Sequence, residues 1–217
     1  MTKIMEKLRD NRHPEGLFFP DTYFFTLKDT DFQILRRAYD RMQIILKKVW
    51  HIRSKNLPYK DPYQALIVAS FIEKETTLPE ERSKIDGVIL SRCVKKKILL
   101  QVDPTVLYGL RRPYDRLITK DDLVSLVPYN TYQNYGLPPI PIDMPSHRSI
   151  LDAVNPDLGE GALYYVAREG GSHVFSSTYQ AHREAVKKYQ RNYEYEKVAT
   201  IPSWTTPYLS VEEKYGK

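Results

Sequence analysis

Little in this sequence could form a disulfide, hold a metal ion or cross a membrane. The chain has a single cysteine, Cys93, which excludes an internal disulfide and any fold that depends on one. It contains no run of 18 apolar residues, and residues 1–12 lack the apolar core of a signal peptide. The sequence therefore predicts neither a membrane-spanning helix nor a signal peptide within these residues.

Several catalytic motifs are also missing. The five histidines lack the spacing of zinc ligands; they are His13, His51, His147, His173 and His182. There is no G-x-S-x-G nucleophile motif and no glycine-rich loop that could cradle phosphates. We therefore expect neither a metal nor a cofactor, and His173 is a candidate either for a ligand contact or for a structural role.

The composition is that of a protein with a sizeable core. Of the 217 residues 41% are hydrophobic, which suits one domain of ordinary size or one with an appendage. The net charge of +6 fits an anionic polymer as partner, but the basic residues are scattered, which argues against nucleic acid. Tyrosine is abundant, with 17 residues, and its flat face and hydroxyl suit both sugar and nucleic-acid surfaces.

The most informative stretch is the nearly unbroken apolar run of residues 65–76, ALIVASFIEKET. Asp61 is a suitable N-cap, Pro62 suits the first helical position, and Gln64 can reach back to the cap. These signals predict a helix over Pro62–Lys74. Because it is apolar on most sides, we expect this helix to be buried.

Two glutamates, Glu73 and Glu75, end this helix. They are separated by about 200° around the helix axis, so they cannot face the same cavity. Glu75 lies in line with the largest apolar side chains, and an apolar surround and a helix C-terminus both raise a carboxyl pKa, as a general acid requires. Thr77 reads as the cap of a new helix, which places a break directly after Glu75. The alternative is that both glutamates simply finish a helix in solvent.

Other elements follow from the same signals. Thr30–Gln33 is a capping box, and apolar residues at three- and four-residue spacing extend its helix to Trp50. Two apolar-rich runs, 162–168 and 172–176, flank residues 169–171 and predict a β-hairpin. Further helices are expected from Thr77 to Val94, from Thr119 to Leu126, from Ser146 to Val154 and from Ser177 to Tyr195. These elements predict an α+β fold, predominantly helical with a small antiparallel sheet.

Five segments together resemble a known family. They are EGLFFPDTY (15–23), ALIVASFIEKET (65–76), LLQVDPTVLYGL (99–110), YNTYQNYGLPP (129–139) and ALYYVAREGGSHVFSSTYQAH (162–182). In this order they resemble the endolytic murein transglycosylases, the MltG or YceG-like family. The resemblance implies a lytic transglycosylase that cleaves the MurNAc-β-1,4-GlcNAc bonds of peptidoglycan and leaves 1,6-anhydro-MurNAc ends.

The resemblance also implies site residues. The general acid/base is a glutamate of the EKE, and Glu75-Thr76 resembles the Glu-Ser at the end of the catalytic helix in lysozyme-like transglycosylases; Glu73 is the fallback. The expected substrate-binding residues are Gln101, Asp103 and Thr105 in a cleft and Tyr129, Asn130 and Tyr132 on the facing loop. The alternative for each of these is a hydrogen bond that only supports the fold.

The resemblance extends to domain organisation and location. Residues 1–14 are expected to be poorly ordered, 15–195 to form the catalytic domain, and 196–217 to be an irregular tail. Family members act in the bacterial cell envelope at the periplasmic face of the inner membrane, on peptidoglycan strands, with cell-wall synthases as candidate partners. They carry a membrane-spanning helix and a LysM-like domain ahead of this region, which leaves open a fragment or a truncated paralogue.

This chain departs from the family pattern in one loop, which bears on activity. Family members have Gly-Pro-Ile and then Asn-Pro-Gly where residues 140–146 read IPIDMPS, and Val102 replaces a commonly polar residue. Lost glycines stiffen a loop. One alternative is therefore a catalytically impaired peptidoglycan-binding or scaffold protein. A second alternative, from a different class and based on the positive net charge, is a basic nucleic-acid-binding module.

Overall fold

The computed structural model describes residues 2–75, 78–92, 98–115, 118–159, 161–168 and 172–189. Its elements are α1 (Thr2–Leu8), α2 (Asp31–His51), α3 (Pro62–Glu75), α4 (Pro79–Leu90), α5 (Asp103–Gly109), α6 (Lys120–Leu123), α7 (His147–Val154), β1 (Tyr164–Ala167), β2 (His173–Ser176) and α8 (Tyr179–Tyr189). The α+β class, mostly helical with a two-stranded antiparallel sheet, is confirmed. Within the described residues no helix is both long and apolar enough to span a bilayer.

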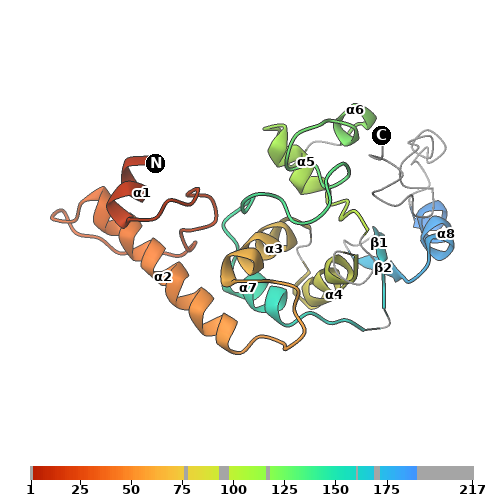
Figure 1. Ribbon diagram of the computed structural model, residues 1–217, viewed down its shortest axis with the longest axis horizontal. Coiled ribbons are helices and arrows are strands. Elements are labelled where there is room, and N and C mark those ends of the chain that lie inside the picture. The colour runs from red at the N-terminus through yellow and green to blue at the C-terminus, as the bar shows by residue number, and fades with distance from the viewer. Residues whose placement is uncertain are drawn as a thin grey trace, which may run out of the picture.

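The elements lie along an elongated molecule (Figure 1). Helices α1 and α2 form one end, and the β1–β2 hairpin with α8 forms the opposite end. Helix α3 lies between them and packs against α2, α4, α5 and α7. The helix that carries the two glutamates is therefore the centre of the packing.

Helix α3 forms as the sequence predicts, with one difference at its start. The Asp61 carboxylate accepts a hydrogen bond from the backbone N–H of Gln64 at 2.9 Å, as expected for an N-cap. The Gln64 side chain accepts from the N–H of Lys60 at 2.8 Å, one residue before the cap we had expected it to reach. The helix ends at Glu75 and α4 begins at Pro79, so the predicted break is confirmed. Thr77 is outside the described residues, and the N-cap of α4 is Leu78, without a side-chain cap hydrogen bond.

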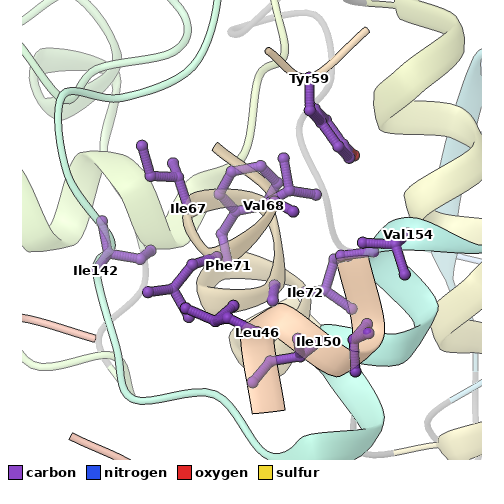
Figure 2. Close-up of a cluster of buried hydrophobic side chains, with 14 of the residues drawn as sticks. Leu46, Tyr59, Ile67, Val68, Phe71, Ile72, Ile142, Ile150 and Val154 are labelled. Carbon is purple, nitrogen blue, oxygen red and sulfur yellow. The ribbon is translucent and has the colours of Figure 1, made fainter. Parts of the chain in front are cut away.

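The core surrounds α3 on all sides (Figure 2). All eight residues from Ala65 to Ile72 are buried, and Phe71 and Ile72 are fully enclosed. Leu46 of α2 and Ile150 of α7 pack in the same cluster. Each large apolar side chain buried in this way contributes about 1.5–3 kcal/mol to stability, so the end of α3 is held in a fixed position.

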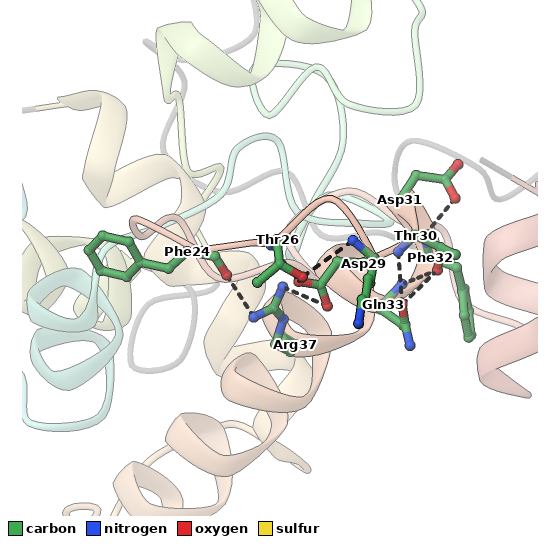
Figure 3. Close-up of polar contacts among 9 residues, drawn as sticks. Phe24, Thr26, Asp29, Thr30, Asp31, Phe32, Gln33 and Arg37 are labelled. Atoms are coloured by element: carbon green, nitrogen blue, oxygen red, sulfur yellow. Dashed lines mark hydrogen bonds and ion pairs between the residues drawn. The ribbon is translucent and has the colours of Figure 1, made fainter.

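The start of α2 is fixed by local hydrogen bonds (Figure 3). Thr30 and Gln33 form the predicted capping box, with Gln33 N–H donating to Thr30 Oγ1 at 3.3 Å and Thr30 N–H donating to Gln33 Oε1 at 2.8 Å. Just before it, Asp29 accepts from the N–H of Thr26 at 2.7 Å. The apolar stripe that follows is buried at Ala38, Met42, Leu46 and Val49.

The N-terminal segment corrects one expectation. Residues 1–14 were predicted to be poorly ordered, but Thr2–Leu8 form α1 and Met5 is buried in the core. Behind it, Asp10 accepts hydrogen bonds from Arg12 and, at 2.6 Å, from the Tyr39 hydroxyl. The segment is ordered because its apolar residues pack against the core and its polar cluster is hydrogen-bonded to Tyr39 of α2. The many charged residues of this segment obscured that packing in the sequence. The predicted tail, 196–217, is outside the described residues.

The hairpin and the last helix form the end of the described chain. Strands β1 and β2 pair antiparallel, with Tyr165 opposite Phe175, which confirms the two predicted runs; residues 169–171 are outside the described range. The ring of Tyr165 lies near those of His173 and Phe175 on one face. Tyr164 alternates to the other face, where it stacks on His182 of α8 at 5.1 Å. The hairpin therefore presents Tyr165 toward the helical core and Tyr164 toward α8.

Candidate active site

Glu75 is the last residue of α3, and it meets the hairpin there. The Tyr165 hydroxyl donates a hydrogen bond to Oε2 of Glu75 at 2.7 Å. The two residues are 90 positions apart in the chain, so only the tertiary fold joins them. Both residues are only partly buried.

A second carboxyl–tyrosine pair lies beside the first. Asp103, the first residue of α5, accepts a hydrogen bond from the hydroxyl of Tyr132. The charge of Asp103 acts on Glu75, and that of Glu75 on Tyr132, so the two pairs are neighbours. Asp103 and Tyr132 are also partly exposed. The structure thus gathers Glu75, Asp103, Tyr132 and Tyr165, which we call the acid cluster, from four separate segments.

Electrostatics within the acid cluster favour the protonated form of Glu75. Burial raises the pKa of Glu75 to about 8, the charge of Asp103 adds to the increase, and the Tyr165 hydrogen bond opposes it. Burial also raises the pKa of Asp103, against the hydrogen bond from Tyr132. These influences favour the protonated form of Glu75 near neutral pH, which is the form that a general acid needs. Within the described ranges, no three His, Cys, Asp or Glu side chains gather as metal ligands would.

Glu73 has the opposite environment. Its Oε2 accepts hydrogen bonds from Ser146 N–H at 3.1 Å, Ser146 Oγ at 2.7 Å and Ser149 Oγ at 2.5 Å. Arg82 lies 3.6 Å from Oε1. Burial favours a higher pKa, but the hydrogen bonds from Ser149 and Ser146 and the charge of Arg82 together lower the pKa of Glu73. Glu73 is thus an ionised group that holds the N-terminus of α7 against α3.

Gln101 is held in a strained backbone conformation. Its φ of 57° is in the left-handed region, which costs a non-glycine residue about 1–3 kcal/mol. Its N–H donates to the carbonyl of Thr131 at 3.1 Å, and its side-chain oxygen accepts from Arg92. The same guanidinium donates to the carbonyls of Leu99 at 2.9 Å and Leu163 at 3.2 Å. Arg92, which sequence reasoning missed, therefore connects the segment of residues 99–101, just before α5, to the start of the hairpin.

Two predicted substrate-binding residues, Thr105 and Asn130, are fully buried, and this corrects their expected role. The Thr105 hydroxyl donates to the carbonyl of Val102 at 2.6 Å and pairs with that of Thr131 at 2.8 Å. The Asn130 amide donates to the carbonyl of Ser125 at 2.7 Å, and its oxygen accepts from Tyr132 N–H at 2.9 Å. Both residues support the loop that carries Tyr132 and have no surface to offer a sugar.

Tyr129 lies on the same loop but has different neighbours. It is partly exposed, and its ring contacts that of Tyr108 edge-on, with centroids 5.0 Å apart. A Cβ added at Gly109 would lie only 2.9 Å from Cβ of Tyr129, so the end of α5 and this loop are in close contact. Glycine at position 109 thus allows the loop to approach α5, and Tyr129 remains an accessible candidate for sugar contact.

The hairpin is attached to α4 through His173. Glu81 accepts the backbone N–H of His173 at 3.0 Å, and its Oε2 lies 2.7 Å from His173 Nδ1. Of the two roles open for His173, the structure therefore shows the structural one. Tyr165 and His173 share a face of the hairpin, with ring centroids 5.5 Å apart. The contacts of Glu81 with His173 therefore also help to position Tyr165. The strand alternation around Tyr165 was the signal in the sequence that could have identified it.

Comparisons with known proteins agree on one family. The model of the YceG-like family matches residues 1–188. An endolytic murein transglycosylase of Bacillus subtilis (strain 168) is 37% identical over 179 residues, which cover 82% of this chain and 49% of that protein. One from Streptococcus pneumoniae (strain D39) is 31% identical over 158 residues, covering 70% and 28%.

A solved structure extends the comparison to the fold. The crystal structure of a YceG-like protein from Listeria monocytogenes matches with a TM-score of 0.73 and 32% sequence identity. The match covers 85% of this chain and 62% of that one. The chain spans about half of the Bacillus relative and less of the Streptococcus one.

Proposed function

Because this chain belongs to the YceG-like family, we propose that it is an endolytic lytic transglycosylase that cleaves MurNAc-β-1,4-GlcNAc bonds in peptidoglycan strands. The substrate class follows the names of the relatives, which are murein transglycosylases. The observation that carries the proposal is the environment of Glu75, a partly buried side chain that is positioned by Tyr165 and has a pKa raised to about 8. A positioned acid that keeps its proton near neutral pH is what glycosidic bond cleavage requires.

The proposed reaction uses Glu75 twice. The protonated carboxyl donates its proton to the glycosidic oxygen, and the bond between that oxygen and C1 of MurNAc breaks, leaving positive charge at C1. The C6 hydroxyl of the same sugar then attacks C1, and the Glu75 carboxylate takes the hydroxyl proton. One C–O bond breaks and one forms, the acid is regenerated, and no water is consumed. A single catalytic carboxyl therefore suffices, unlike in ordinary glycosidases, which need two.

The other members of the acid cluster have supporting roles in this proposal. The hydrogen bond of Tyr165 to Oε2 orients the carboxyl and leaves Oε1 for the proton transfer. Asp103 raises the pKa of Glu75 and, when ionised, places negative charge near the positive charge that develops at C1. Tyr132 holds Asp103. Glu73 cannot replace Glu75 in this role, because it is ionised and its hydrogen-bonding capacity is used by α7.

Product analysis tests the reaction directly. We expect purified sacculi digested with this chain to release muropeptides with 1,6-anhydro-MurNAc ends, identified by mass spectrometry, and the Glu75→Gln variant to release none. In H₂¹⁸O, these ends should carry no label because water does not attack C1. Labelled reducing ends would indicate a hydrolase instead. Binding to sacculi without any cleavage would support the scaffold alternative and overturn the proposal.

We also propose that the protein works in the bacterial cell envelope, at the periplasmic face of the inner membrane. The relatives' names refer to murein, which lies outside that membrane. Cell-wall synthases, which make the strands, are the candidate partners. Fractionation of cells that express the tagged native gene should place it with the envelope, and recovery in the cytosol alone would contradict this location.

A further inference from the structure

A second feature of the molecule is a cavity of about 460 Å³ between α3, α4 and the loop of residues 136–139. The buried residues Ile67, Val68, Ile89 and Leu90 lie at its base. Its more accessible apolar lining comes from Pro58, Tyr63, Leu137 and Pro139. Its rim is polar and includes Lys60, Asp61 and Gln64. An apolar floor with a few polar groups at the mouth is typical of a site for a small ligand or a peptide.

The walls of this cavity are fixed by the fold. Tyr59 is buried, and its hydroxyl donates to Asp86 at 3.3 Å. Figure 2 shows Tyr59, Ile67 and Val68 on the side of α3 opposite Leu46. On the loop, Pro138 and Pro139 restrict the backbone. The cavity is therefore formed before any ligand binds.

Two elements connect the cavity with the acid cluster. Ile67 precedes Glu75 by eight residues on α3, which corresponds to about 12 Å along the helix axis. Tyr132 of the cluster precedes Gly136 at the cavity by four residues, at most about 14 Å of chain. The cavity and the acid cluster therefore lie along the same helix and the same loop.

We propose that this cavity binds the peptide attached to the MurNAc residue whose bond is cleaved, an inference that rests on the proposed function. In peptidoglycan, a short peptide is joined through the lactyl group on C3 of MurNAc. Three or four extended residues span about 10–14 Å, which is comparable with the helix rise of about 12 Å between Ile67 and Glu75. The alanine methyl groups of such a peptide suit the accessible apolar lining at Tyr63 and Leu137. Its carboxylates suit the ammonium group of Lys60, and an amino group of the peptide suits the neighbouring carboxylate of Asp61.

The test compares glycan strands that carry peptides with strands from which an amidase has removed them. For the wild-type chain we expect the peptide-bearing strands to have the higher kcat/KM. Lys60→Glu should reduce the ratio of the two kcat/KM values about tenfold. Lys47→Glu, an exposed charge reversal on α2, is the matched control and should leave the ratio unchanged. Equal losses on both substrates, or no change in the ratio, would overturn the proposal.

A binding measurement separates this inference from the proposed reaction. Titration of the full chain with a synthetic tetrapeptide, L-Ala-D-Glu-L-Lys-D-Ala, should give heat of binding by calorimetry that Lys60→Glu weakens about tenfold. Binding without any cleavage of sacculi would retain the peptide site and reject the catalytic function. Cleavage without peptide binding or peptide preference would do the reverse. Thermal unfolding of each variant checks that it is folded.

Discussion

The two glutamates at the end of α3 provide an internal comparison. They are two residues apart on one helix, yet Glu73 faces α7 and Glu75 faces α5 and the hairpin. Glu73 accepts three hydrogen bonds from two serines and lies near a guanidinium. Among the residues that the structure describes, Glu75 accepts one hydrogen bond, from a tyrosine, and it lies near another carboxyl. The first arrangement stabilises the ionised form and the second the protonated form.

This difference shows what determines the use of each carboxyl. Both are at the same helix terminus, so the helix dipole acts similarly on both and cannot separate them. What separates them is the number of donors and the sign of the nearest charge, which neighbouring elements supply. A carboxylate with several hydrogen-bond donors and a nearby cation stabilises the fold. A carboxyl with few donors and a nearby anion keeps its proton and remains available for chemistry. The following experiments test this contrast.

The largest expected effect is on activity. Glu75→Gln should reduce the rate of anhydro-product formation by about a thousandfold, the usual range for losing a general acid. Glu73→Gln, the matched control on the same helix, should retain most activity in its folded fraction. Quantitative mass spectrometry of digested sacculi measures both. Equal losses in the two variants would remove the functional distinction between the residues.

The next largest effect concerns stability, and we expect it for substitution of Glu73. Glu73→Ala should lower the free energy of unfolding by about 2–3 kcal/mol, since the charge-assisted hydrogen bonds to Ser146 and Ser149 are lost. Denaturant titration followed by circular dichroism gives the value. Glu75→Ala is the comparison and should be far less destabilising, because it removes a partly buried, protonated carboxyl and its hydrogen bond from Tyr165. A larger loss of unfolding free energy for Glu75→Ala than for Glu73→Ala would contradict the structural role of Glu73.

The pH dependence of the rate should report Glu75. The protonated form is the active one, so the rate should be constant below the pKa and fall as the pH rises through about 8. Asp103→Asn removes the charge that helps to raise this pKa, so the decline should begin at lower pH. Initial rates between pH 5 and 10 locate the decline in each protein. An unchanged profile in Asp103→Asn would show that Asp103 does not act on Glu75.

The smallest effect should come from Tyr165→Phe, with the opposite sign. The hydrogen bond from Tyr165 lowers the pKa of Glu75, so its removal should move the decline to higher pH. The maximal rate should fall only several-fold, since the hydrogen bond orients the acid without transferring its proton. The same rate series measures both quantities. A shift in the same direction as for Asp103→Asn would be inconsistent with the proposed electrostatics.

Much of the local structure could be predicted from the sequence, because its causes lie close together in the chain. The capping box at Thr30 and the N-cap at Asp61 each depend on residues within three positions. The strands of the hairpin and the break after Glu75 likewise follow from neighbouring residues. Helix α5 was not foreseen, since alternating polar residues before Gly109 gave no clear helical period. The burial of Thr105 and Asn130 was also missed, because their hydroxyl and amide resemble sugar-binding groups in sequence.

By itself the sequence determined a central apolar helix, two glutamates on different sides of it, and the segments that resemble one family. The tertiary structure alone decided what surrounds each glutamate. The hydroxyl group that donates to Glu75 belongs to Tyr165, 90 positions away in the chain. The serines that donate to Glu73 lie 73 and 76 positions away. A pKa depends on burial, donors and charge within a few ångströms, and distant segments supply all three here. Local patterns could therefore nominate both carboxyls, but only packing distinguishes their protonation states.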